Sequence, residues 1–90
     1  MIIRVVRQQF GSFRRCYEHG LQTNPALAGR VAVKFIIGAN GDVTFAADGG
    51  SDLASSNVRD CVIARVRSLI FPKPEHGIVT VVYPVIFGKS

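Results

Sequence analysis

Four residues of this chain carry side chains that nucleophilic, redox or metal chemistry would use: Cys16, His19, Cys61 and His76. Two cysteines in a small chain permit one disulfide, and two buried free thiols in a reducing compartment are the alternative. Cys16 and His19 lie one helical turn apart, so the four residues are also a candidate set of metal ligands. Their spacing matches no common zinc pattern, and we therefore expect neither a metal site nor another cofactor.

Catalysis by a cysteine needs a positioned base, and His19 is within reach of Cys16 on a helix. The sequence has no oxyanion turn, Gly-rich phosphate loop or pair of carboxylates to accompany these two residues. Asp48 and Asp52 flank Gly49–Ser51, but this composition is typical of a capping and turn-forming loop. The sequence therefore predicts a protein that is not an enzyme.

The composition indicates one small globular domain. The chain has 90 residues, of which 48% are hydrophobic, and a net charge of +5 that favours anionic partners. Four arginines lie in the first predicted helix, but the strands lack the aromatic pair of RNA-binding sheets, so we expect a solvated basic face and no nucleic acid. No apolar run approaches the roughly 20 residues that span a bilayer, so membrane attachment is expected only through an anchor outside this chain.

Helical periodicity marks two segments. In Ile3–Leu21, apolar residues recur every three or four positions, and mostly polar and basic residues occupy the other face. Gly11 lowers helix stability by about 1 kcal/mol relative to Ala, which predicts either a break in the helix or a close backbone contact. A second helix is expected to start at a cap within residues 55–57 and to end at Phe71-Pro72.

Three segments alternate like strands. Arg30–Ile37 has one apolar face, and a turn over residues 38–42 joins it to a second strand to form a hairpin. Ile78–Phe87 is the strongest strand signal, because all its odd positions are apolar. In the second strand, the residues expected to face the core are Val43, Phe45 and Ala47.

The order of these elements predicts an α+β fold of αββαβ type. We expect a three-stranded antiparallel sheet of order 2-1-3, with two helices packed on one face. The last strand is then an edge, which agrees with Pro84, a residue that has no N–H to donate to a ladder. The backbone N–H and C=O groups of successive residues point to opposite sides of a strand. Those of Thr80, Val82 and Ile86 are therefore predicted to point to the free side, together with the backbone of Pro84.

The sheet face away from the helices is predicted to be apolar. A patch of this kind on a small domain is typical of an interaction surface, or of a face that another segment or a second copy covers. The residues expected there are Ala32, Ile36, Ala46, Ile78, Val82 and Ile86.

Local patterns in the same order along nearly the whole chain resemble the TonB C-terminal domain family. Within it, they are similar to the AgmX/PglI C-terminal subgroup, known from gliding-motility and related envelope proteins of myxobacteria. The patterns are Cys16-Tyr17-Glu18, Asn24-Pro25, Gly29-Arg30-Val31, Ile37-Gly38, Gly41-Asp42-Val43, Val58 with Cys61-Val62, Phe71-Pro72 and Val79 to Pro84.

The resemblance implies a periplasmic, noncatalytic module that is a C-terminal piece of a longer protein anchored in the inner membrane. Such modules transmit force or signal across the envelope by binding an outer-membrane or periplasmic protein. The oxidising periplasm that the resemblance implies favours a disulfide between Cys16 and Cys61.

We therefore predict that a partner segment binds beside the last strand by adding a strand to it. Pro84 departs from the best-known relatives, whose strand is uninterrupted, and it limits the predicted pairing to a short window around Thr80 and Val82. The competing interpretation is a structural domain that forms homodimers through the same edge or face, and a small redox or metal-binding protein built on Cys16 and Cys61 is third. The predicted partner-binding residues are Ile36, Ile78, Thr80, Val82, Pro84 and Ile86.

Overall fold

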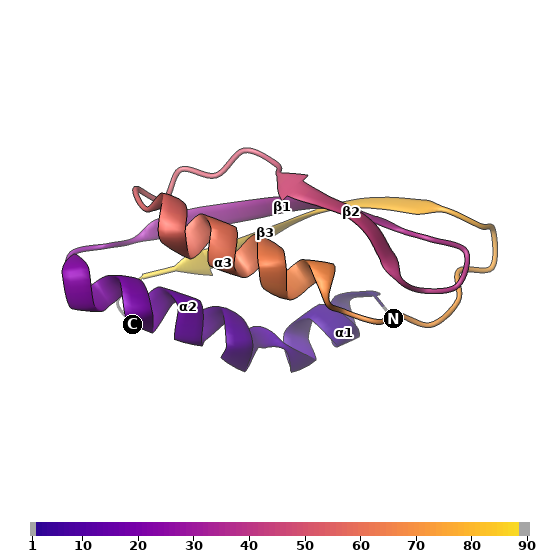
Figure 1. Ribbon diagram of the computed structural model, residues 1–90, viewed down its shortest axis with the longest axis horizontal. Coiled ribbons are helices and arrows are strands. Elements are labelled where there is room, and N and C mark those ends of the chain that lie inside the picture. Colours follow the sequence, from indigo (N-terminus) through magenta and orange to yellow (C-terminus); the bar gives the residue numbers. More distant parts are fainter. Residues whose placement is uncertain (1, 89–90) are drawn as a thin grey trace.

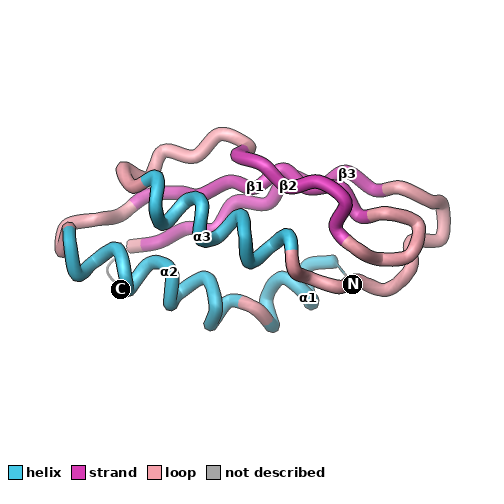
Figure 2. The backbone as a smooth tube through the Cα atoms, in the orientation of Figure 1, coloured by secondary structure: helices cyan, strands magenta, loops and turns pink. Residues whose placement is uncertain are grey.

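A computed structural model describes residues 2–88, in which three helices lie over one face of a three-stranded antiparallel sheet (Figure 1). Figure 2 shows the two layers, with the helices along one side of the strands. The elements are α1 (Ile2–Gln8), α2 (Phe10–Thr23), β1 (Gly29–Ile37), β2 (Val43–Asp48), α3 (Ser56–Arg67) and β3 (Val79–Phe87).

The strand order is β2-β1-β3, so the predicted α+β fold and its 2-1-3 sheet are confirmed. β1 pairs antiparallel with β2 on one side and with β3, over its whole length, on the other. β3 is therefore an edge strand, as Pro84 indicated.

The long first helix of the sequence prediction is divided into α1 and α2. The break lies at Gln9, whose φ of −96° and ψ of 6° leave the helical range, and whose carbonyl accepts the N–H groups of Ser12 and Phe13. It does not arise from packing at Gly11, because no atom beyond its chain neighbours and the backbone of its own helix lies within 4 Å of the position that a Cβ would take there. Both Val6 before the break and Phe13 after it are fully buried.

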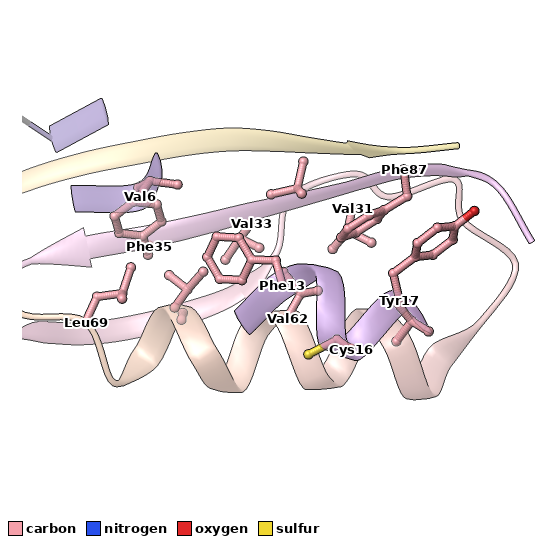
Figure 3. Close-up of a cluster of buried hydrophobic side chains, with 14 of the residues drawn as sticks. Val6, Phe13, Cys16, Tyr17, Val31, Val33, Phe35, Val62, Leu69 and Phe87 are labelled. Atoms are coloured by element: carbon pink, nitrogen blue, oxygen red, sulfur yellow. The ribbon is translucent and has the colours of Figure 1, made fainter. Parts of the chain in front are cut away.

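The core lies between the helices and the sheet, and Figure 3 shows its central side chains. Two aromatic stacks tie the layers together, Phe35 on Phe71 with ring centroids 5.7 Å apart and Tyr17 on Phe87 at 4.7 Å. The Tyr17 hydroxyl donates a hydrogen bond to the Leu27 carbonyl, which satisfies its one buried polar group. The residues that contribute the largest fully buried side chains are Phe13, Phe35, Ile37, Val6, Val31, Val33, Val58, Val62 and Val85.

α2 and α3 pack side by side at a close contact. A Cβ atom at Gly20 would lie 2.4 Å from Cγ2 of Val58, so only glycine fits this position without movement of α3. One turn earlier on α2, Cys16 is joined to Cys61 of α3. The two helices therefore meet along a single seam that a covalent bond closes.

The direction of the β2 side chains corrects the sequence prediction. The register shifts between Ile36 and Ile37, which oppose Phe45 and Val43, so Thr44 is an extra residue in β2. Such a bulge reverses the alternation beyond it. As a result Ala46 faces the core, whereas Phe45, predicted to be inside, is 47% exposed on the opposite face.

α3 begins as predicted, with the Ser55 side chain accepting a hydrogen bond from the Val58 N–H at 3.2 Å. It ends at Arg67, before the predicted stop at Phe71-Pro72. The buried Phe71 lies in the segment beyond the helix.

Candidate functional site: the free edge of the sheet

The direction of the backbone groups in β3 follows from the residues opposite them on β1. Ala32, which opposes Pro84, accepts a hydrogen bond from the Gly49 N–H at 2.7 Å and donates its own N–H to Ser51 Oγ at 3.0 Å. Both of its backbone groups thus point to the β2 side. Pro84 therefore occupies a pair without hydrogen bonds, where its missing N–H does not interrupt the β1–β3 ladder.

The same alternation turns the backbone N–H and C=O groups of Thr80, Val82 and Ile86 away from β1. Within residues 2–88, no side chain or loop makes a hydrogen bond to the backbone of these three residues. The free edge of β3 thus offers three complete donor–acceptor pairs, plus the carbonyl of Pro84.

The edge formed by β2 is different, because the last residue of α3 and the segment after it make contacts with this edge and with the turn before it. The Arg67 guanidinium donates to the Ala46 carbonyl at 3.0 Å, and this carbonyl points away from β1. Ile70 forms an isolated bridge with Asp42, and the N–H of Phe71 bonds to the Gly41 carbonyl at 2.8 Å. The pattern of the sequence gives no sign of this contact, which joins residues 21 positions apart.

The sheet face away from the helices carries most of the predicted apolar patch. Ile36 is half-buried between Phe45 and Thr80, which oppose it on either side. Val82 is 56% exposed and Ile86 is 65% exposed. A band of apolar side chains therefore borders the free edge of β3 on its outer side.

Three details of the patch differ from the prediction. Ala46 points to the helices because of the bulge, and Ala32 is buried because residues 49–51 lie against it. Ile78 is 70% exposed, but it precedes β3 and so stands at the end of the edge. Phe45 occupies the place on the outer face that was predicted for Ala46.

Cys16 and Cys61 form a disulfide, with their Cα atoms 5.8 Å apart. It lies in a groove of about 410 Å³ between α2 and α3, which His19 also lines but His76 does not. Because both sulfurs are used in the bond, the alternative set of four ligands is not assembled. Within residues 2–88, no group of three or more His, Cys, Asp or Glu side chains is placed to hold a metal ion.

The loop after β2 is a hydrogen-bonded turn, as its composition indicated. Asp48 accepts from the Ser51 hydroxyl at 2.6 Å and from the N–H groups of Ser51 and Gly50. These bonds, the Ser51 hydroxyl first, lower the pKa of Asp48 below its ordinary value of 3.8. Asp52 accepts from the Arg30 N–H at 2.6 Å. Each of the two carboxylates therefore accepts hydrogen bonds from backbone N–H groups, and the two do not form a pair.

The site is thus one open sheet edge with an apolar border on an α+β domain. In the described part of the chain, no helix is long and apolar enough to cross a membrane.

The fold is similar to that of the C-terminal domain of TonB from Helicobacter pylori, whose solution structure aligns with a TM-score of 0.63. The sequences are 19% identical, and the alignment covers 92% of this chain and 82% of the TonB domain. No family model and no curated protein sequence matches the chain. The predicted resemblance is therefore confirmed at the level of the fold, and the AgmX/PglI subgroup stays a prediction.

Proposed function

We propose that this domain is a noncatalytic protein-interaction module that binds an extended segment of a partner by adding a strand to β3. The observation that carries the proposal is the set of unused backbone groups at Thr80, Val82 and Ile86, next to exposed apolar side chains. An added strand pairs with such groups, and its alternate side chains lie along the apolar border. The β2 edge, with Arg67 and Phe71 on it, offers no comparable run.

Pro84 divides the edge into two parts of unequal length. Thr80 and Val82 form one part, and Ile86 forms the other. Opposite Pro84, a partner residue can donate to the carbonyl but finds no N–H for its own carbonyl. Since a typical backbone hydrogen bond contributes about 0.5–1.5 kcal/mol, most of the main-chain affinity comes from Thr80 and Val82.

The similarity to a TonB C-terminal domain supports a place for this module in the cell envelope. We propose that it is periplasmic, that the chain is part of a longer protein anchored in the inner membrane, and that its partner is an outer-membrane or periplasmic protein. An energy-transducing or gliding-motility assembly of the AgmX/PglI type fits this arrangement. The disulfide fits an oxidising compartment.

Crosslinking in cells tests whether the partner sits at this edge. A photoreactive residue at Thr80, on β3, should yield a crosslinked partner, whereas the same residue at Thr44, an exposed position of β2, should yield none. A crosslink of equal intensity from Thr44 would contradict the proposal.

Val82→Pro should abolish partner binding while the fold is retained. The substitution removes an N–H that points to the free side, so the ladder between β1 and β3 keeps its bonds. We expect at least about a tenfold loss of affinity, measured by fluorescence anisotropy with a partner peptide. Val82→Thr keeps the N–H and the strand propensity and is the control. Unchanged affinity of folded Val82→Pro would exclude strand addition at this position.

A homodimer through the same edge is the second candidate function. The exposed Val82 and Ile86 favour it, because an antiparallel pair of β3 strands would bring these side chains of the two copies together on one continuous sheet face. Light scattering separates the two functions: a stable dimer at low concentration that binds no peptide would support the second, and a monomer would support the first.

A further inference from the structure

A groove runs between α2 and the C-terminal end of β3, on the helix side of the free edge. Its volume is about 260 Å³, and its floor consists of apolar side chains of α2 and β3. The α2 residues are Phe10, Tyr17 and Leu21, and the β3 side chain is Phe87. Ile86 borders the groove from the strand, but its side chain lies on the opposite face of the sheet. We call it the α2–β3 groove.

The groove opens toward the free edge, because α3 occupies the other flank of α2. Cys16 and Gly20 of α2 contact Cys61 and Val58 of α3. The groove residues lie on the opposite flank of the helix. A strand added to β3 would therefore have its outer-face side chains beside Val82 and Ile86, and its helix-facing side chains above the groove.

Two opposite charges line the same groove. Arg14 and Glu18 are both exposed, lie one turn apart on α2 and, in the described part of the chain, form no ion pair with each other. Their separation along the helix is about 6 Å, since an α-helix rises 1.5 Å per residue. Residues i and i+2 of a strand are about 6.7 Å apart, and their side chains point to the same face of the sheet.

α2 and β3 both run along the long axis of the molecule (Figure 1). A strand added to β3 would thus pass Arg14 and Glu18 in succession, with a spacing that matches its own two-residue repeat. The rim is complementary to one acidic and one basic side chain at positions i and i+2 of that strand.

We infer that the partner is an extended peptide whose helix-facing side chains include an apolar residue for the α2–β3 groove, and an acid and a base two residues apart for Arg14 and Glu18. This inference rests on strand addition to β3. It adds the chemistry of the partner, which the free edge alone does not determine.

A displayed library of random short peptides tests the inference without knowledge of the natural partner. The library is selected on the wild-type domain and on the charge-swapped variant Arg14→Glu/Glu18→Arg, which has the same net charge. Wild-type selections should be enriched in an acid and a base two residues apart, and selections on the variant should show the reverse order. A peptide selected on the wild type should bind the variant about fivefold more weakly, as expected for exposed ion pairs.

The matched control is Arg59→Asp/Asp60→Arg, which swaps the charges of an exposed pair on α3. Peptides selected on this variant should keep the wild-type order. Enriched peptides with no charge pattern, or with the same order on the Arg14/Glu18 swap, would overturn the inference but leave strand addition intact. No enrichment on any of the three proteins would overturn strand addition itself.

Discussion

The two edges of the three-stranded sheet, β2 and β3, are protected from further pairing to different degrees. β2 has six residues, contains a bulge at Thr44, and is covered by Arg67 and by the segment at Ile70 and Phe71. β3 has nine residues, pairs with β1 without a shift and has only Pro84 to interrupt its free side. Soluble proteins protect exposed edges with bulges, short strands and basic side chains, and only β2 uses all of these devices.

The difference indicates where the chain avoids pairing and where it permits it. A domain of this size can protect a sheet edge, since a single arginine and the segment after α3 protect β2. The β3 edge also has exposed apolar side chains beside it, which would be a liability in a domain without a partner. We therefore regard the open edge as a functional feature.

Removing the disulfide is expected to have the largest effect on stability. The bond ties α2, whose free flank faces the β3 edge, to α3, which packs against β2 and β1. Its cysteines are 45 residues apart, so Cys16→Ala/Cys61→Ala should lower the free energy of unfolding by up to about 4 kcal/mol. Denaturant unfolding with and without a reductant measures this change. Reduction should destabilise the wild type and leave the double variant unaffected; a loss below about 1 kcal/mol would mean that the seam holds without the bond.

The comparison of the edges was only partly predictable from the sequence. The side-chain directions of β1 and β3 followed from alternation, because both strands are regular over their whole length. The same reasoning failed for β2, since alternation contains no sign of the extra residue Thr44. The position of Pro84 on the free side was predictable, because a proline has no N–H to donate to a ladder in any fold.

Features that depend on distant contacts were not predictable. Arg67 looks like any exposed helical arginine until the fold brings the Ala46 carbonyl to it. The α2–β3 groove likewise joins residues from opposite ends of the chain, such as Phe10 and Ile86. Gly11 led us to predict a possible break in the first helix, but its position at Gln9 did not follow from the sequence.

Opening the protected edge should have a smaller effect. Arg67→Met keeps most of the aliphatic stem but removes the hydrogen bond to Ala46, and it should lower the free energy of unfolding by about 1 kcal/mol. Arg65→Met, an exposed change in the same last turn of α3, is the control and should have little effect. Equal losses in thermal unfolding of both variants would show that Arg67 does not stabilise the β2 edge.

The smallest effect is expected from the loop that leaves β2. The pKa of Asp48 is lower in the folded state than its ordinary value of 3.8, so its stabilising contribution is complete above that value and is lost as the pH falls through the folded pKa. Asp48→Asn should therefore lose less stability than the wild type between about pH 5 and about pH 2. The difference should stay well below about 1 kcal/mol, because the carboxylate is exposed. Parallel pH profiles of the two proteins in chemical denaturation would contradict this role of Asp48.

Amide hydrogen exchange, measured by NMR with and without a library-selected peptide, tests the central claim most directly. We predict that the peptide slows exchange at Thr80, Val82 and Ile86, whose N–H groups point away from β1. The outward N–H of Ala46 on β2 should exchange at the same rate in both samples. Protection of Ala46 by the peptide, or unchanged exchange at Thr80 and Val82, would show that partners do not bind by adding a strand to β3.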